Sequence, residues 1–280
     1  MSKRNLPKVD LGARPGVQGD ISPKALQRWS PDVKAAAGEG EATISILDPI
    51  GADIWGEGVT ARRISGALRS IGDRPVTVNV NSPGGDYFEG LAIYNLLREH
   101  KQEVTVNVLG VAASAASIIA MAGDQVRIAR AGWLMIHNTW ILAAGDRNAM
   151  REVADWLEPF DAMAVDIYAT RTGIAAEDLA RMLDRETWIG GQGAVDQGFA
   201  DDLLPSDLVD HGQEGGAGAS MRAERKFDLL ARRAGLSNSA SRDLLRELKS
   251  GMPGAALTGQ PGAADLQLEL QQLLSQAKSL

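Results

Sequence analysis

The chain has 280 residues and a formal net charge of −7 at pH 7, which argues against general nucleic-acid binding by the whole chain. It contains no cysteine, so disulfides and thiolate metal sites are excluded, and its three histidines lack the spacing of a zinc site. No signal-peptide pattern and no apolar run near the ~18–20 residues needed to cross a membrane is present, so we expect a cytoplasmic protein.

The N-terminal part differs in composition from the part that follows it. Residues 1–41 are polar, rich in Pro, Gly and Lys, and lack sustained periodicity, so we expect a flexible arm. Strand-like and helix-like runs then alternate, which predicts an α/β fold with right-handed crossovers. The strand-like runs are residues 42–47, 76–81, 103–109 and 125–129, and the helix-like runs are residues 60–70, 87–100 and 113–121. Residues 146–170 follow with a long helical pattern of apolar positions.

Two turns after strand-like runs attract attention. The run at residues 76–81 leads into Pro-Gly-Gly at residues 83–85. Such residues are the usual punctuation of loops, and a simple loop is the ordinary interpretation, but glycine also lets a ligand approach the backbone closely. The valines of residues 104–108 alternate with polar residues, and we expect Gly110 to end that strand and residues 112–122 to form a helix.

Ser114 then lies at a strand-to-helix turn, and His137 ends the next apolar run. A serine hydroxyl is a poor nucleophile until a base removes its proton, so this pair predicts a serine hydrolase. Unpaired N–H groups in the first helical turn would bind an oxyanion beside Ser114. Taken singly, Ser114 is more typical of a helix N-cap and His137 of a buried, hydrogen-bonded ring. We expect Ser117, one turn further on, to pack or to bond to a carbonyl within the helix.

Three motifs occur together, in a fixed order. They are Asn-Ser-Pro-Gly-Gly at residues 81–85, Gly-Val-Ala-Ala-Ser at residues 110–114 and Met-Ile-His at residues 135–137. In order and approximate spacing they resemble the Clp protease proteolytic-subunit family of serine peptidases, over residues 42–204. The resemblance implies a ClpP/crotonase-like fold, a repeated β-β-α superhelix whose helical handle corresponds to the segment around residues 146–170. It also implies homo-oligomeric, stacked rings.

A narrower resemblance concerns biological role. Stretches such as Ile-Gly-Ala-Asp-Ile-Trp at residues 50–55 and Glu-Thr-Trp at residues 186–188 are similar to those of phage head-maturation (prohead) proteases. This implies a phage or prophage protease that cleaves capsid or scaffold proteins inside the host cytoplasm, within assembling proheads. Whether an ATPase unfoldase takes part is left open.

The resemblance assigns roles to individual residues. Ser114 matches the nucleophile and His137 the general base, while the backbone N–H groups of Gly85 and Ala115 match the oxyanion hole. Glu186 falls where the family usually has an aspartate, and we rank it first as the third triad member. Asp184 ranks second, on the same face if the stretch is extended. A different acid, or none, stays open. The resemblance implies no metal or organic cofactor.

The C-terminal part is again distinct. We expect a linker over residues 205–221 and a partly disordered, partly helical extension over residues 222–280, with helical stretches at residues 227–233, 241–249 and 265–280. The extension resembles those of some phage proteases, in which it implies capsid targeting or self-cleavage; a disordered tail without a dedicated role is the alternative.

Two other functions compete with the peptidase. A crotonase-type acyl-CoA enzyme would share the fold and an oxyanion hole, and a catalytically weak capsid-assembly scaffold protein would need ring formation more than turnover.

Overall fold

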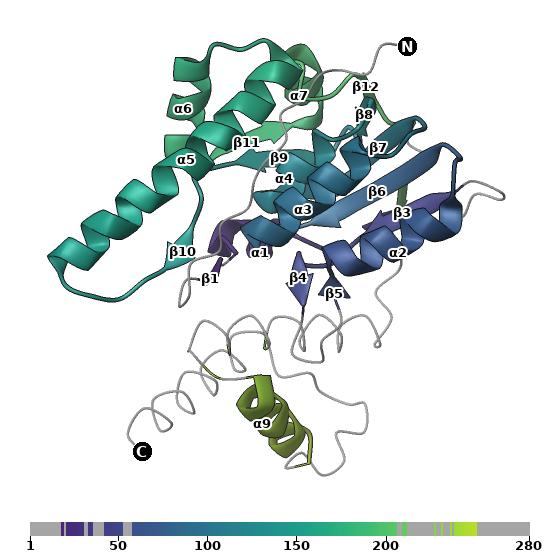
Figure 1. Ribbon diagram of the computed structural model, residues 1–280. Coiled ribbons are helices and arrows are strands. Elements are labelled where there is room, and N and C mark those ends of the chain that lie inside the picture. The colour runs from purple at the N-terminus through teal and green to yellow at the C-terminus, as the bar shows by residue number, and fades with distance from the viewer. Residues whose placement is uncertain are drawn as a thin grey trace. The chain divides into compact units, whose positions relative to one another are not determined.

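The computed structural model (Figure 1) describes part of the chain. The described residues are 18–19, 21–30, 33–35, 42–52, 58–205, 209–211, 227, 231, 236 and 238–250. The chain divides into two compact units, Met1–Ala219 and Ser220–Leu280.

A largely parallel sheet forms the centre of the first unit. Its strands run in the order β11-β9-β7-β6-β3, with β8 beside β7 and β12 beside β8. The bounds are β3 (Thr43–Ile46), β6 (Val76–Ser82), β7 (Val104–Ala113), β8 (Gln125–Ile128), β9 (Trp133–Ile136), β11 (Thr187–Gly190) and β12 (Asp202–Leu203). All neighbouring pairs of this sheet are parallel except β11 and β9. The prediction of an α/β fold is therefore confirmed.

Helices connect and cover these strands (Figure 1). They are α1 (Pro23–Arg28), α2 (Ala61–Ile71), α3 (Tyr87–Arg98), α4 (Ala115–Ala120), α5 (Arg147–Thr172), α6 (Ala176–Asp184) and α7 (Gly191–Asp196). Their starts follow local chemistry, because Thr60, Asp86 and Asp146 each accept a backbone N–H of the helix that they precede. Gly173, at φ 74, ends α5, which has 26 residues, in the left-handed conformation favoured by glycine.

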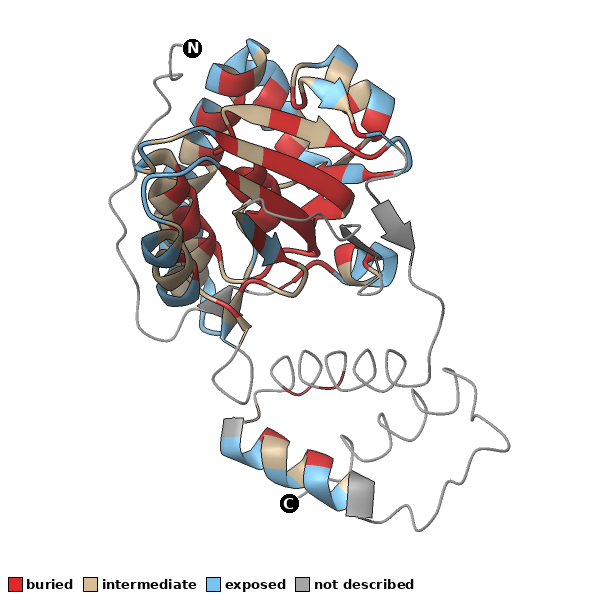
Figure 2. Cartoon of the chain, turned by 90° about the vertical axis from the view of Figure 1, so that its right-hand side faces the viewer, coloured by how far each residue is buried: buried red, intermediate tan, exposed pale blue. Residues whose placement is uncertain are grey.

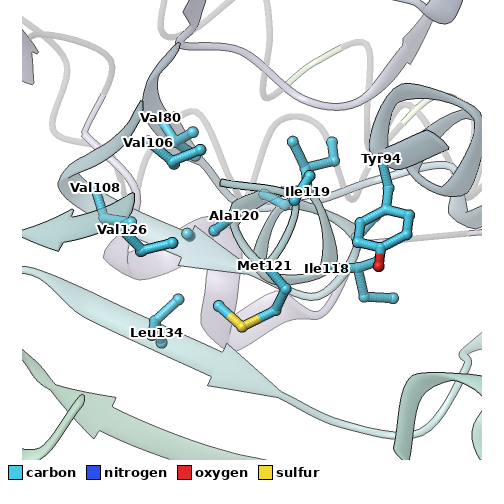
Figure 3. Close-up of a cluster of buried hydrophobic side chains, with 14 of the residues drawn as sticks. Val80, Tyr94, Val106, Val108, Ile118, Ile119, Ala120, Met121, Val126 and Leu134 are labelled. Carbon is cyan, nitrogen blue, oxygen red and sulfur yellow. The ribbon is translucent and has the colours of Figure 1, made fainter. Parts of the chain in front are cut away.

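The core is densest around α4 (Figure 3). Every residue of α4 is buried, and its side chains meet valines of β6, β7 and β8. Small residues allow this depth, since a Cβ placed on Gly90 of α3 would lie 2.8 Å from the Ala115 Cβ. Figure 2 shows the buried residues concentrated in the central strands. The turn before α4 is thus held by rigid packing on both sides.

Three short antiparallel pairs flank the sheet. They are β1 (Gln18–Gly19) with β10 (Ile141–Leu142), β2 (Val33–Ala35) with β13 (Val209–His211), and β4 (Gly51–Ala52) with β5 (Gly58–Val59). Residues 21–30 belong to the segment expected to be a flexible arm, and for these residues the structure differs. Ala25 and Trp29 are buried, and Trp29 Nε1 donates to the Asn81 carbonyl at 2.8 Å.

One local expectation is wrong, and the condition under which Asp184 would share a face with Glu186 is not met. Gly110 does not end its strand, because Val111, Ala112 and Ala113 continue β7 by pairing with β9, so α4 begins only after Ser114. The stretch around Asp184 is not extended, because Asp184 is the last residue of α6. No local pattern in the sequence predicted α6, α7 or β11 as separate elements.

In the second unit, α9 (Asn238–Ser250) contains the stretch 241–249 expected to be helical. Ser241 and Leu245 are buried four positions apart, on one face of this helix. Phe227 and Ala231 are helical and buried, within the expected stretch 227–233. The expected helix at residues 265–280 and most of the expected linker lie outside the described residues.

Two features are absent from the described residues. None of the helices there is long and apolar enough to cross a membrane. In the same part of the chain, no group of three or more His, Asp or Glu side chains could hold a metal ion.

Candidate active site

Ser114 occupies a strained turn between β7 and α4. Its backbone has φ 54 and ψ −126, and its N–H donates to the Met135 carbonyl at 2.9 Å. The side chain makes no capping bond to α4. Instead, Ser114 Oγ lies 2.7 Å from His137 Nε2. The N-cap interpretation of Ser114 therefore does not describe what its hydroxyl does.

His137 follows β9 directly, and the sheet brings it to the serine. The parallel pairing of β7 with β9 sets Ala113 beside Met135, so the two strands end side by side at the same edge of the sheet. Burial lowers the pKa of His137 below its ordinary value of 6.5, and the negative charge of Glu186 opposes this in part. A neutral imidazole at this distance can accept the serine proton.

The Pro-Gly-Gly turn lies against Ser114. A Cβ on Gly84 would stand 2.5 Å from the Ala113 carbonyl oxygen and 2.7 Å from Ser114 Cβ. A Cβ on Gly85 would stand 2.2 Å from the Ile50 carbonyl oxygen. Both glycines have positive φ, at 87 and 149 degrees. Only glycine therefore allows this turn to approach the serine so closely.

The structure also bears on which N–H groups are available for an oxyanion. The Gly84 N–H donates to Ser82 Oγ at 3.2 Å, so this N–H already has a hydrogen-bond acceptor. Ala115 is the first residue of α4, where backbone N–H groups have no partner within the helix. This arrangement favours Gly85 over Gly84 as the donor that accompanies Ala115.

Glu186 lies near His137 because of strand pairing. The antiparallel register of β11 and β9 pairs Thr187 with Ile136, and Glu186 and His137 are the residues next to this pair. Glu186 itself is outside the strand, with a positive φ of 50 degrees. Burial alone would raise the pKa of Glu186, but hydrogen bonds from Lys24, Trp188 and Ser22 outweigh it, and the pKa is lowered. Glu186 is thus an ionised neighbour of the imidazole.

The hydrogen bonds of Glu186 go to other groups. Ser22 Oγ donates to Glu186 Oε2 at 3.1 Å, and Trp188 Nε1 donates to Oε1 at 3.3 Å. Lys24 Nζ lies 3.2 Å from the same Oε1. The influence of Glu186 on His137 is electrostatic in this structure.

Asp184 interacts at a different place. Its Oδ1 accepts a hydrogen bond from Asn138 Nδ2 at 2.8 Å, in the loop after His137. Among the causes of the His137 pKa shift, Glu186 is the acid that contributes. The geometry therefore favours Glu186 over Asp184 as the third member.

Backbone strain marks the same residues. Within the described part of the chain, the non-glycine residues with positive φ are Ser114, at 54, and Glu186, at 50 degrees. Such a conformation costs about 1–3 kcal/mol, and it concentrates at functional sites. For Ser114 this strain supports the assignment independently of the motifs. For Glu186 it follows from the end of α6, because the residue after the C-cap Arg185 commonly adopts the left-handed conformation, and the Glu186 N–H donates to the Leu183 carbonyl.

Ser117 has a structural role, as expected. Its Oγ donates to the Ser114 carbonyl at 2.6 Å and lies 2.8 Å from the hydroxyl of Tyr168. This confirms the expectation that it bonds to a carbonyl within the helix. Ser22 and Lys24, in contrast, were missed. Nothing in their local sequence connects them with Glu186, which follows Ser22 by 164 positions in the chain.

A family model described as Clp protease matches residues 60–207, more than half of the chain. The chain belongs to the Clp protease family. Family membership implies a serine-type peptidase. The Clp match does not favour the acyl-CoA alternative.

Curated relatives agree with this assignment. ATP-dependent Clp protease proteolytic subunit 1 of Cutibacterium acnes is 28% identical over 143 residues, 48% of this chain and 64% of that protein, which is just under two thirds of its length. Proteolytic subunit 2 of Thermobifida fusca is 30% identical over 150 residues, which are 51% of this chain and 74% of that protein. Proteolytic subunit 3 of Streptomyces avermitilis is 28% identical over 182 residues, which are 64% of this chain and 80% of that protein. Among solved structures, a ClpP1 mutant from Listeria monocytogenes is similar, with a TM-score of 0.48 and 24% identity over 59% of this chain and 92% of that chain.

Proposed function

We propose that this protein is a serine endopeptidase in which Ser114 is the nucleophile, His137 the general base and Glu186 the acid. The observation that carries the proposal is the 2.7 Å contact between Ser114 Oγ and His137 Nε2 at a strained turn. Family membership supplies the reaction class.

The chemistry follows from this geometry. His137 Nε2 takes the hydroxyl proton as Ser114 Oγ forms a bond to the scissile carbonyl carbon. The resulting oxyanion accepts hydrogen bonds from the N–H groups of Gly85 and Ala115, and removal of one such donor costs about 100–1000-fold in turnover. The imidazolium then gives its proton to the leaving amine as the peptide bond breaks.

Deacylation repeats these steps with water. His137 takes a proton from the water molecule, whose oxygen attacks the acyl-enzyme, and returns it to Ser114 as the ester breaks. Glu186, ionised and near His137, stabilises the imidazolium in both halves of the reaction. No step in this sequence requires a metal or an organic cofactor.

We also propose the narrower biological role. Similarity of the stretches around residues 50–55 and 186–188 to prohead proteases supports cleavage of capsid or scaffold proteins during phage head assembly in the host cytoplasm. A homo-oligomeric ring fits this role, because an enclosed site would spare folded host proteins. The names of the relatives describe ATP-dependent proteases. For this chain, a peptidase assay with and without an ATPase unfoldase tests whether an unfoldase is needed.

A fluorophosphonate probe, read by intact mass, tests the reaction class. We expect one adduct on the wild-type chain, none on Ser114→Ala, and an adduct on Ser117→Ala, which serves as the matched control. Absence of labelling in the assembled protein would overturn the peptidase and favour the scaffold alternative. Coenzyme A binding without labelling would favour the acyl-CoA enzyme.

Substrate class needs a second measurement. Incubation of the wild-type and Ser114→Ala chains with capsid and scaffold proteins, followed by fragment mapping, should show cleavages that only the wild type makes. If the wild type cleaves a generic unfolded protein but neither of these substrates, the phage role fails while the peptidase stands.

A further inference from the structure

The segment before the family-matched region reaches the candidate active site. The family model begins at residue 60, whereas Ser22 and Lys24 both bind the carboxylate of Glu186. Ser22 precedes α1 as its N-cap residue, yet its side chain makes no capping bond. Its hydroxyl is directed at Glu186 instead.

The α1 segment is firmly docked at this place. The guanidinium of Arg28 stacks on Trp188, 4.2 Å from the ring centroid, and lies 5.5 Å from the centroid of Trp133. Stacking of this kind contributes about 0.5–2 kcal/mol, more when it is desolvated. Ser22 is 3% exposed and Ala25 is fully buried. The segment is therefore part of the wall of the site.

The carboxylate of Glu186 needs such support. Glu186 has a positive φ and comes immediately before β11, so its own backbone is strained. Ser22 holds one carboxylate oxygen, and Lys24 with Trp188 holds the other. A carboxylate bound on both oxygens is restricted to one orientation, which keeps its charge near His137.

From these contacts we propose that Ser22 and Lys24 are positioning residues that act on His137 through Glu186. The proposal rests on the proposed function, because it assumes that His137 is the base. It extends the site beyond the family-matched region to a helix far away in the sequence.

Other charged groups near His137 also bear on its protonation. Asp184 is bonded to Asn138, and Asp161 accepts the Thr139 N–H at 2.6 Å, so both acids face the loop after His137. Lys24 is the cation that pairs with Glu186. Lys24 also holds that carboxylate in place, so its removal lets the carboxylate turn away from His137, which withdraws stabilisation from the imidazolium and lowers the pKa of His137.

The variants follow from this reasoning. In Ser22→Ala and Lys24→Met, kcat should fall about ten-fold with KM little changed, the size expected for loss of one hydrogen bond to a charged group. The acidic limb of the kcat profile should move to lower pH in Lys24→Met, because a carboxylate that is no longer held near His137 stabilises the imidazolium less. Ser22→Thr and Lys24→Arg should restore most of kcat, because each keeps the donor.

The experiment uses the full chain, a fluorogenic peptide and a pH series, with a thermal melt of each variant. Lys101→Met is the matched control, since Lys101 is also exposed and paired, with Asp73 at 3.6 Å. In a Glu186→Gln background, Lys24→Met should have no further effect on kcat. This double substitution separates a positioning role from a general loss of folding.

The outcomes are distinct. A wild-type chain without hydrolysis or probe labelling defeats the proposed function itself. An active wild type whose Ser22→Ala and Lys24→Met variants behave like Lys101→Met defeats only the positioning role. A rise in kcat in these variants also defeats it, because it would mean that α1 restrains the site.

Discussion

Replacing Gly84 with alanine tests whether the close approach of the Pro-Gly-Gly turn to Ser114 builds the site. At φ 87, a residue with a Cβ costs about 1–2 kcal/mol relative to glycine. The new Cβ would also lie 2.5 Å from the Ala113 carbonyl oxygen. That oxygen is backbone and cannot swing aside, so the turn must shift, at a cost of about 1–3 kcal/mol for overpacking.

Together these contributions amount to about 2–5 kcal/mol. For a domain of this size, we expect the melting temperature to fall by about 4–20 °C. The loss of activity should be larger than the unfolded fraction explains, because a shift of about 1 Å at reacting atoms costs about 100-fold. Thermal melts and the rate of fluorophosphonate labelling, measured well below the transition, give both quantities.

Gly173→Ala is the control. Gly173 has φ 74, but nothing lies within 4 Å of the position of its Cβ. Only the backbone cost of about 1–2 kcal/mol applies, and labelling of Ser114 should not change. Equal falls in melting temperature for the two variants, with normal labelling of Gly84→Ala, would refute the reasoning.

Four further predictions concern pH, packing and a buried ion pair. Because burial lowers the pKa of His137, the acidic midpoint of the kcat/KM profile should lie below pH 6.5; a midpoint above 6.5 would contradict this. The unfolded chain protonates this ring at a higher pH than the folded chain does, so stability should decline as pH falls below 6.5, and His137→Gln should remove that part of the decline in urea titrations. Ile119→Ala, at a fully buried position, should cost about 2–5 kcal/mol in urea unfolding against about 0.5–1.5 for Ile119→Val, and equal costs would argue against tight packing there. Asp201→Ala should lower the free energy of unfolding by about 3–5 kcal/mol, because it leaves the fully buried Arg171 guanidinium without its carboxylate. Arg171→Met should cost less, because Asp201 is partly exposed and still accepts the Val126 N–H. The reverse order of urea midpoints would count against this account.

Much of the fold follows from local pattern. Alternating valines predicted β6 and β7, and helical periodicity predicted α3 and α5. Burial goes beyond those patterns in the strands, where almost every residue of β6 and β7 is buried, and falls short of them in α5, whose buried residues lie between Ala164 and Arg171. The end of β7 was missed, because the valine alternation stops where pairing with β9 takes over.

The N-terminal segment shows the opposite case. Residues 21–30 are short and mixed in composition, so their own pattern carries no signal. Their order depends on surfaces that distant residues supply, such as the Asn81 carbonyl and the Trp188 ring. The local sequence pattern alone therefore could not predict α1.

The sequence by itself predicted the reaction class and the residues proposed to carry it, since the proposed nucleophile, base and glycine turn each lie in a motif of a few neighbouring positions. The tertiary structure decided what those residues do to one another. Strand register places Glu186 near His137, and helix packing brings Ser22 to Glu186. The physical reason is that motifs record local backbone geometry, whereas the pairing of acid with base depends on long-range hydrogen bonds between strands.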